Sequence, residues 1–339
     1  MRSQVRGGRV WVEVTRGEAV ESVHEVEVAV VDDDGRAVAW AGRTEEPVFT
    51  RSAIKPLQAL PLVADGVVER FGITEEELAL CCASHSGEAR HVALARSLLD
   101  RIGLDEAALA CGPHEPFHRE SARALRESGR APGRVHNNCS GKHAGMLALA
   151  RTHDWPIEGY QLAGHPVQER VKREVERWSG VDGADIPTGV DGCGVVTFAV
   201  PLSGVARAFA RLAADGAGPA ARVLDAMGRH PDVVGGTGRL CTAVIQATAG
   251  RVIAKVGAEG VYAVAARDRG WGMGVKVRDG APRAVEPALV AVLDALEWIQ
   301  GAQRRMLDRW LRPVIRNTRD EAVGEIRARV ELAGPGGTA

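Results

Sequence analysis

Hydrophobic and polar residues alternate over residues 10–42, as they do in β-strands with one buried face. The runs VWVEV, VESVHEVEVAVV and AVAWAG carry the alternation. The segment DDDGR at residues 32–36 separates the last two runs and has the composition of a hairpin turn. The sequence therefore predicts that the chain opens with antiparallel strands.

From Ser52 to about residue 230 the pattern becomes mostly helical. The helical segments are SAIKPLQALPLV, TEEELALCC, ARHVALARSLLDRI, SGKHAGMLALART and HPVQERVKREVERW. Strand patterns return in RVIAKVGA, GVYAVAAR and WGMGVKVRDG, followed by a long helix, EPALVAVLDALEWIQ, and a last strand, AVGEIRARVEL. Strands at both ends bracket helices in the middle. This order predicts a mixed α/β fold, an antiparallel sheet flanked by helices, rather than alternating βαβ units.

The length of 339 residues fits one large domain or two ordinary ones. Neither a long linker nor a repeat is apparent along the chain. We expect a single domain over residues 8–333 and a flexible tail, GPGGTA, over residues 334–339.

The formal net charge of -1 gives no basic surplus, which argues against nucleic-acid binding. The N-terminal segment lacks the apolar core of a secretory signal, and no stretch is as long and apolar as a membrane span. We therefore expect a cytoplasmic protein without membrane contact. The six cysteines are too few and too scattered for a disulfide scaffold, so they are expected as free thiols unless some bind a metal.

Lysine is rare, because only 5 of the 43 basic residues are lysines. Arginine stays protonated, whereas a buried lysine can lose its proton and act as a base or ligand. The lysines that lie inside motifs are therefore candidates for chemistry.

The first such motif is Ser-x-x-Lys, formed by Ser52 and Lys55 in RSAIKP. At the start of a helix this spacing puts the hydroxyl and the amine on one face, where a neutral amine can take the hydroxyl proton. The alternative is a helix-capping serine followed by a surface lysine.

A second serine cluster, CASHSGE, contains Ser84 and Ser86 between two helical patterns. Small polar groups at such a junction are typical of a site loop. The alternative is that Ser84 or Ser86 caps the next helix, with Glu88 in its first turn.

The segment HNNCSGKH at residues 136–143 packs a thiol, an amine, amides and two imidazoles in front of an apolar helix. Paired with DGCG at residues 191–194, it would supply two thiolates, half of a tetrahedral zinc site. Two unreactive buried cysteines are the alternative. Lys255-x-Gly257 lies on a predicted strand, as does the Lys-x-Gly wall of Ser-x-x-Lys active sites, and GGTG at residues 235–238 is interpreted as a turn.

Together these motifs, with GHPVQ, GVDGCGVVTFAVPL, RHPDVVGGTGRLCT and AKVGAEGVYA, resemble the Rhizobium etli-type L-asparaginases, the thermolabile inducible class. The resemblance is ordered and spans residues 10 to about 332. It implies a fold like that of the serine β-lactamases and penicillin-binding proteins. One visible departure is Gly87, in a stretch that varies within the family.

The resemblance implies a role for each matching residue. Two Ser-Lys pairs meet at the family's site, which implies Ser52 with Lys55 and Ser84 with Lys255. The family's zinc, one per chain with water completing the shell, implies three ligands: Cys139, Lys142 and Cys193. Three further residues stand where the family lines its substrate pocket: Arg51, His143 and Asp191.

The implied reaction is hydrolysis of L-asparagine to L-aspartate and ammonia through an acyl-enzyme, with Ser52 as nucleophile and Lys55 as base. The serine assignments can also be exchanged. The zinc is expected to organise substrate rather than to generate hydroxide, and the family's habit favours a homodimer. The alternatives are a Ser-Lys amidohydrolase acting on glutamine, a peptide or a lactam, and a non-catalytic amino-acid-binding protein on the same fold.

We expect Ser52→Ala to abolish turnover and leave the fold intact, because a hydroxyl exposed to substrate contributes little to the core. The loss of kcat should reach several orders of magnitude, as for nucleophiles generally. Ammonia release and circular dichroism of the variant test both parts. Activity within about tenfold of the wild type would remove Ser52 from this role and direct attention to Ser84.

Overall fold

The computed structural model describes residues 7–335 and 337–338, and its chain divides into two compact units. The first unit comprises residues 1–53, 200–214 and 247–339, as far as these are described. The second comprises residues 54–199 and 215–246.

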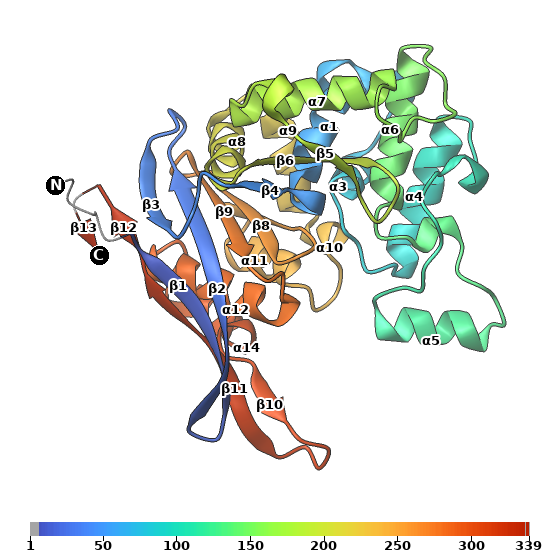
Figure 1. The fold of residues 1–339 in the computed structure, drawn as a ribbon. Coiled ribbons are helices and arrows are strands. Elements are labelled where there is room, and N and C mark those ends of the chain that lie inside the picture. Colours follow the sequence, from blue (N-terminus) through green and yellow to red (C-terminus); the bar gives the residue numbers. More distant parts are fainter. Residues whose placement is uncertain (1–6, 336, 339) are drawn as a thin grey trace. The chain divides into compact units, whose positions relative to one another are not determined.

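The first unit is built mainly of strands (Figure 1). Its strands are β1 (Arg9–Arg16), β2 (Ala19–Val31), β3 (Ala37–Ala41), β4 (Pro47–Phe49), β7 (Val252–Val256), β8 (Val261–Ala266), β9 (Trp271–Val277), β10 (Val314–Arg316), β11 (Ala322–Glu331), β12 (Ala333–Gly334) and β13 (Gly337–Thr338). Its helices are α8 (Leu202–Ala214), α12 (Pro282–Ala295), α13 (Gly301–Met306) and α14 (Asp308–Leu311).

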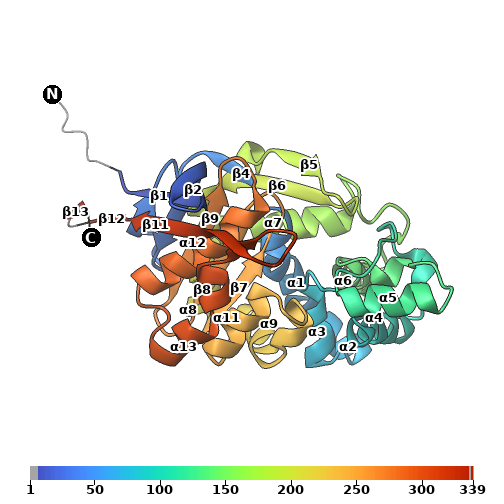
Figure 2. The ribbon, with the colours of Figure 1, turned by 90° about the horizontal axis from the view of Figure 1, so that it is seen from below.

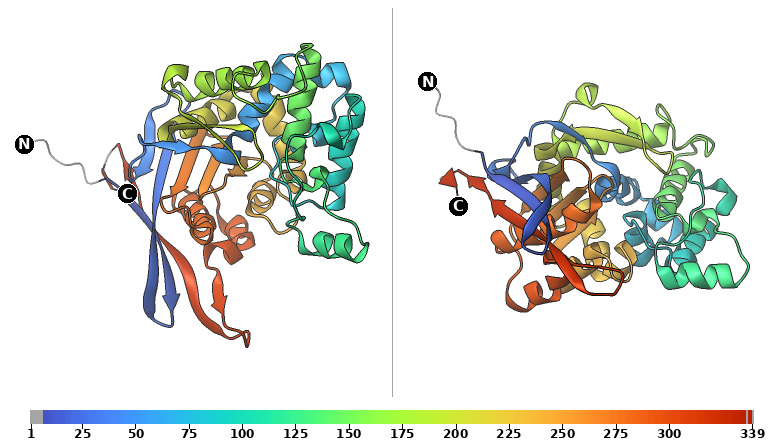
Figure 3. Two further views of the ribbon diagram at one scale, coloured as in Figure 1. Left: turned by 45° about the vertical axis from the view of Figure 1, so that its right-hand side comes forward. Right: turned by 60° about the horizontal axis from the view of Figure 1, so that its bottom comes forward.

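The strands from the two ends of the chain share one antiparallel sheet. Strand β1 pairs with β2 on one side and with β11 on the other, so that Val12 faces His24 and Ala328. Strand β2 also pairs with β9, which continues through β8 to β7. Figure 3 shows the paired arrows of β1, β2, β10 and β11 from two further sides. The predicted sheet, including the turn at residues 32–36, is confirmed.

Alternation along β1 explains why this strand holds its register. Val10, Val12 and Val14 are buried, whereas the side chains between them are only half-buried. A slip by one residue would move these valines to the other face of the sheet.

Helix α8 lies close against β9 because that strand has glycines where the two elements touch. A Cβ at Gly272 would overlap the backbone of Ala206 and Ala210, and one at Gly274 would lie 2.9 Å from the carbonyl oxygen of Leu202. The short distance between helix and sheet therefore depends on the missing side chains.

The second unit is mainly helical. Its helices are α1 (Lys55–Ala64), α2 (Val67–Phe71), α3 (Glu75–Cys81), α4 (Ala89–Arg101), α5 (Arg119–Glu127), α6 (Ser140–Thr152), α7 (Pro166–Ser179), α9 (Pro219–Arg229), α10 (Pro231–Val234) and α11, which runs on to the first unit (Leu240–Ala247). A strand pair is formed by β5 (Thr188–Val190) and β6 (Val196–Pro201). Its short 3-10 turns are η2 (Glu106–Ala108), η3 (Arg134–His136) and η4 (Gly183–Asp185), and η1 (Arg51–Ile54) lies where the chain passes from the first unit to the second.

Helix α6 is the core of this unit, because every residue from Ser140 to Ala150 is buried. It contacts α1, α2, α3, α4 and α7, and Figure 2 shows it beside α4. Two glycines let it approach α3: a Cβ at Gly141 would overlap the carbonyl of Leu80, and one at Gly145 would lie 2.9 Å from Cys81 Sγ. The first turn of α6, which carries the chemical groups of HNNCSGKH, is thereby held inside the unit.

The structure confirms a mixed α/β fold with an antiparallel sheet and helices beside it. The single domain over residues 8–333 stays a prediction. Part of the segment predicted as a flexible tail forms β13, which pairs with β12, and Gly336 and Ala339 lie outside the described residues. Within the described part of the chain, no helix has both the length and the apolar character needed to cross a membrane.

We expect Gly272→Ala to destabilise the protein strongly. The added methyl group would collide with the backbone of α8, and overpacking of this kind costs about 3 kcal/mol of unfolding free energy. Gly216→Ala is the matched control, because a Cβ at Gly216 meets nothing within 4 Å. Denaturant unfolding of the two variants measures the difference, and equal stabilities would contradict the close packing of α8 on β9.

Candidate active site

The amine of Lys55 lies at the centre of the candidate site in the second unit. Lys55 is the first residue of α1, and its side chain is fully buried, with 0% exposure. Its Nζ donates to the carbonyl oxygen of Ala83 at 2.5 Å and to Ser84 Oγ at 3.1 Å, and lies 3.4 Å from the carbonyl oxygen of Asn138. The alternative of a surface lysine is therefore wrong.

Ser52 lies in the 3-10 turn η1, directly before α1, and is half-buried. The N-cap of α1 is Ile54, so the interpretation of Ser52 as the helix cap is wrong. Ser52 belongs to the first unit and Lys55 to the second. The pairing of Ser52 with Lys55 stays a prediction, whereas the contact of Lys55 with Ser84 was not predicted.

Two further predicted site residues, Lys255 and Arg51, belong to the first unit. Lys255 lies on β7, is fully buried, and donates to the carbonyl oxygen of Val256 at 2.7 Å. Its predicted partner Ser84 belongs to the second unit, so this pairing also stays a prediction. Arg51 has a φ of 49°, a left-handed conformation that is uncommon for a residue with a side chain, and its guanidinium lies 4.0 Å from the Glu259 carboxylate. Strained backbone of this kind gathers at functional sites.

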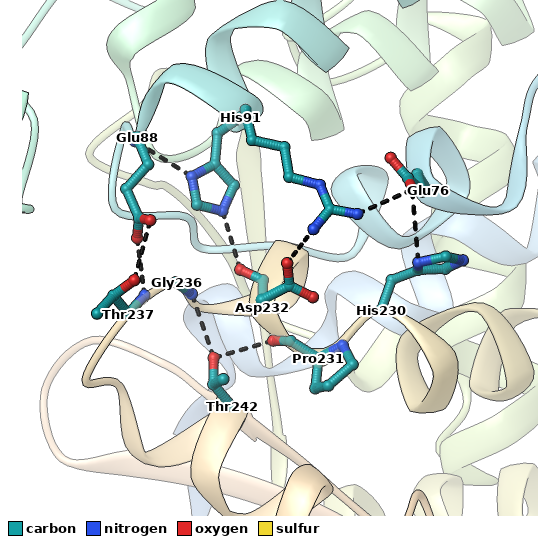
Figure 4. A network of polar contacts seen from close by, with 10 residues as sticks. Glu76, Glu88, His91, His230, Pro231, Asp232, Gly236, Thr237 and Thr242 are labelled. Atoms are coloured by element: carbon teal, nitrogen blue, oxygen red, sulfur yellow. Dashed lines mark hydrogen bonds and ion pairs between the residues drawn. The ribbon is translucent and has the colours of Figure 1, made fainter.

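The loop from Cys82 to Glu88 carries Ser84 and is held by the segment that follows α9. The N–H of Ser84 donates to the carbonyl of Val234 at 3.1 Å, and Ser86 Oγ donates to that of Gly235 at 2.8 Å. The same two segments also meet at Glu88, whose carboxylate accepts from the backbone N–H and the hydroxyl of Thr237 (Figure 4). The hydroxyls of this loop are thus fixed by tertiary contacts. The N-cap of α4 is Glu88, so the capping interpretation of Ser84 and Ser86 is wrong.

Gly87, the departure from the family pattern, is explained by its backbone. Its φ is 73°, in the left-handed region, and a Cβ there would lie 3.0 Å from Pro116. Glycine is therefore the residue that suits this turn.

Two thiols and an amine meet at the start of α6. Cys139 precedes the helix and Lys142 lies in its first turn, while Cys193 comes from the turn between β5 and β6. Lys142 Nζ lies 3.0 Å from Cys193 Sγ, and the two cysteines hydrogen-bond to one another. All three side chains are buried. The structure thus brings together the three residues predicted as zinc ligands.

The cluster is strongly polarised. The hydrogen bond from the Cys193 thiol holds the pKa of Cys139 well below its ordinary value, and the charges of Lys55 and Lys142 act in the same direction. The same bond raises the pKa of Cys193. Burial would lower the pKa of Lys142, but the sulfurs of Cys139 and Cys193 outweigh it and raise that pKa. Lys55 also hydrogen-bonds to the Cys139 sulfur, so its amine joins this cluster to the Ser84 hydroxyl.

His143 follows Lys142 in α6, and its ring is oriented by Tyr160. The phenol oxygen accepts from the N–H of Ala110 at 2.9 Å and lies 2.6 Å from His143 Nδ1. Burial raises the pKa of Tyr160, which keeps its proton and donates it in this bond. Burial, followed by the charges of Lys142 and Lys55, lowers the pKa of His143 well below its ordinary value. The imidazole is therefore neutral, with its hydrogen on Nε2.

This Nε2–H group of His143 is buried and finds no hydrogen-bond partner among the described residues. A buried donor without a partner is costly, and such groups are rare in folded proteins. A ligand oxygen placed there would satisfy it. Asp191, the third predicted substrate residue, is half-buried in the turn that carries Cys193, and its charge acts on Lys142.

The donor chemistry of the Cys139 cluster fits zinc, which prefers sulfur and nitrogen ligands. A tetrahedral ion would need the amine and the sulfur to move apart by about half an ångström, from 3.0 Å to about 3.5 Å. Among the described residues, no group of three or more His, Cys, Asp and Glu side chains could hold a metal ion, so a site here depends on Lys142 as a ligand.

The prediction from sequence did not include Tyr160, Asn138 or His85 as site residues. Tyr160 positions His143, the carbonyl of Asn138 faces Lys55, and His85 lies between Ser84 and Ser86. Asn138 lies in HNNCSGKH and His85 in CASHSGE, two segments with the composition of a site, and this position was a usable signal. Tyr160 stands alone in its segment, and nothing in the sequence pattern connects it with His143.

Comparison with known families places the chain among the amidohydrolases. The family model that matches is described as L-asparaginase II, and it covers residues 12–328. The chain therefore belongs to this family. The resemblance found in the sequence is confirmed at this level.

Solved structures of a protein called Mglu are similar to this chain only remotely. The native form in the presence of 4.3 M NaCl has 18% identity and a TM-score of 0.33, with 75% of this chain and 56% of that chain covered. The glutamate form has 17% identity and a TM-score of 0.34, with 84% and 61% covered. The chain thus spans about three-fifths of the length of these structures. A comparison with curated proteins gave no significant match.

We expect Tyr160→Phe to lower the free energy of unfolding by about 2 kcal/mol, because both the Ala110 N–H and His143 Nδ1 lose a buried partner. Denaturant titration measures the variant beside the wild type. A Tyr160→Phe variant as stable as the wild type would show that the phenol does not hold His143.

Proposed function

We propose that this protein hydrolyses L-asparagine to L-aspartate and ammonia. The observation that carries the proposal is the fully buried amine of Lys55, hydrogen-bonded to the Ser84 hydroxyl in a chain of the L-asparaginase II family. A buried amine beside a serine hydroxyl is the arrangement that Ser-Lys hydrolases use to activate a nucleophile.

The proposed reaction has two stages. A serine oxygen attacks the side-chain amide carbon of asparagine while a neutral lysine takes the hydroxyl proton, and the proton then passes to the leaving nitrogen, which departs as ammonia. Water next attacks the acyl-enzyme ester, the serine recovers its proton, and aspartate is released. We assign Ser52 as nucleophile with Lys55 as base, and Ser84 with Lys255 to proton relay or to the second stage.

The contact between Lys55 and Ser84 supports one competing assignment, in which Ser84 is the nucleophile. Both assignments use the Lys55 amine. The Ser52→Ala and Ser84→Ala variants distinguish them, because loss of the nucleophile removes the acyl-enzyme whereas loss of a relay slows its formation or hydrolysis.

We assign substrate recognition to three residues of suitable chemistry. Arg51 would bind the α-carboxylate, since a guanidinium binds carboxylates in a forked geometry. Asp191 would bind the α-ammonium group. The unpartnered Nε2–H of His143 would donate to an oxygen of the substrate.

We also propose one zinc ion per chain, held by Cys139, Lys142, Cys193 and a water. Its support is the convergence of two thiols and an amine in a buried cluster. A bound zinc would act as a Lewis acid that orients substrate. The chain's own contribution is to hold three buried ligands at the start of α6 and on the Asp191–Gly194 turn.

The remaining parts of the proposal are a fold like that of the serine β-lactamases and penicillin-binding proteins and a homodimer, which the family resemblance implies. A cytoplasmic location without nucleic-acid partners is proposed from the sequence composition. Ser-x-x-Lys at the start of α1 and Lys-x-Gly at the end of β7 support the proposed fold.

Ammonia release from L-asparagine, measured beside L-glutamine with and without chelator, tests the function. We expect turnover of asparagine well above that of glutamine. Turnover of glutamine, a peptide or a lactam instead would favour the other amidohydrolase, and amino-acid binding without ammonia release would favour a non-catalytic binding protein.

We expect Lys55→Arg and Lys255→Arg each to lose most activity, because a guanidinium does not give up its proton near neutral pH and cannot act as a base. Lys172→Arg, on α7, is the control and should keep full activity. Steady-state kinetics measures all three. An active Lys55→Arg variant would exclude its amine as the base.

We expect protein purified without chelator to contain about one zinc per chain, and Cys139→Ser to lose most of it, because a hydroxyl replaces a thiolate ligand. Cys241→Ser changes a buried cysteine of α11 and serves as the control. Elemental analysis decides the question. Zinc content near zero in the wild type even after zinc addition, or unchanged content in Cys139→Ser, would contradict the proposed site.

A further inference from the structure

The imidazole of His85 connects two segments of the candidate site. It is fully buried, between Ser84 and Ser86 in the loop before α4. Its Nδ1 accepts from the N–H of Gly87 at 3.2 Å, within the loop. Its Nε2 lies 2.9 Å from Ser140 Oγ, at the start of α6.

The donors and acceptors around this ring permit one tautomer. A backbone N–H can only donate, so Nδ1 of His85 carries no hydrogen and Nε2 carries it. The Ser140 hydroxyl gives its own hydrogen to the carbonyl oxygen of Val135 at 3.1 Å, and it therefore accepts from His85. Every polar atom in this chain of bonds is satisfied only while His85 is neutral.

A second imidazole, that of His91, repeats the arrangement in the first turn of α4. The rings of His85 and His91 stack with their centroids 4.9 Å apart and 12° between their planes. Nδ1 of His91 accepts from the N–H of Glu88 at 3.1 Å, and its Nε2 donates to the carbonyl oxygen of Asp232 at 3.1 Å (Figure 4). The stacked pair thus spans from the start of α6 to the segment around Asp232.

The surroundings keep the pair neutral. Burial lowers the pKa of both histidines, and the charges of neighbouring residues lower that of His85 further. The titratable groups that act on His85 are His91, Lys55, His114 and His136, and those that act on His91 include Glu88, Asp232 and Arg90. Arg90 forms ion pairs with Asp232 and Glu76, which leaves the Asp232 carbonyl to His91.

The hydrogen bond between His85 and Ser140 joins two residues that each follow a residue bonded to Lys55. Ser84, whose hydroxyl accepts from Lys55, precedes His85, and Cys139, whose sulfur also bonds to Lys55, precedes Ser140. The backbone N–H of His85 in addition donates to the carbonyl of Asn138 at 3.3 Å. A change in the length of the His85–Ser140 bond would therefore move Ser84 and Cys139 relative to the Lys55 amine.

We propose that His85 is a positioning residue for the reaction, and that its neutral Nε2–H tautomer, bonded to Ser140 and stacked on His91, fixes the Ser84 loop against the Lys55 amine. The inference rests on the proposed hydrolase function. It assigns His85 no contact with substrate.

Asparagine and glutamine each replace one of the two ring nitrogens of His85, so the two substitutions separate the bond to Gly87 from the bond to Ser140. Asparagine at position 85 keeps an acceptor for the Gly87 N–H but does not reach Ser140, whereas glutamine can reach Ser140 with an N–H group. We expect His85→Asn to lower kcat for asparagine by about a hundredfold with KM within about threefold, because a misplaced group affects the chemical step more than binding. His85→Gln should recover part of that loss. His153→Asn, at a half-exposed histidine after α6, is the control and should leave kcat unchanged.

Ser140→Ala should lower kcat to a similar extent, and the double variant His85→Asn/Ser140→Ala should be no slower than the slower single variant. A purely structural role would lower the melting temperature and the active fraction but leave kcat per folded molecule unchanged. Additive losses, or a His85→Asn variant with kcat within twofold of the wild type, would overturn the proposal.

The tautomer is tested without reference to activity, by long-range proton–nitrogen spectra of protein labelled with ¹⁵N-histidine. We expect His85 and His91 to show hydrogen on Nε2 alone at neutral pH. Hydrogen on Nδ1, or a charged ring, would overturn the inference. If the wild type releases no ammonia from asparagine, the proposed function fails, and the spectra still decide whether His85 makes the inferred bond.

Discussion

A buried amine must have acceptors, and the arrangement of the second unit follows from this requirement at Lys55. Burying an ammonium or amine without partners costs several kcal/mol. Lys55 finds its partners in the Ala83 carbonyl, the Ser84 hydroxyl and the Cys139 sulfur. These belong to the loop after α3 and to the start of α6, which are far apart in the sequence. The Lys55 amine therefore constrains the positions of both segments. The Ser84 hydroxyl and the Cys139 sulfur lie near one another because both bond to this amine.

Three polar residues, Ser140, Lys142 and His143, are buried together in the first turn of α6, because neighbouring helices pack around this part of the helix. The backbone at a helix start has N–H groups without intrahelical partners, so the polar residues of HNNCSGKH serve local bonding as well as chemistry. Asn137, for example, accepts from the N–H of Cys139 at 2.9 Å. From Ala144 to Ala150 the residues of α6 are apolar or small and buried, which anchors the polar turn in the core.

The sequence allowed the strands to be predicted, because Val10, Val12 and Val14 repeat with the period of a sheet, and it indicated the chemistry, because Ser52, Lys55 and the segment 136–143 hold residue types that a core does not need. The contact of Lys55 with Ser84 could not be predicted, since it depends on how α1 packs against a loop about 30 residues away. The bond from Tyr160 to His143 was equally hidden: a single aromatic residue has no periodicity, and only the fold brings it to α6. The meeting of Lys142 with Cys193 was expected from the family resemblance alone, because spacing within HNNCSGKH gives no information about a residue 51 positions away.

The first and last long strands of the chain, β1 and β11, are partners, and β1 lies between β11 and β2. A ribosome delivers β1 before β11, so one edge of β1 must stay unpaired while residues 17–321, which separate the two strands, are made. The second unit is assembled from residues 54–199 and 215–246, which are all made during this interval, whereas the sheet must close the loop that separates β1 from β11. An unpaired strand edge promotes association between chains, so the β1–β2 hairpin exposes such an edge until β11 is made.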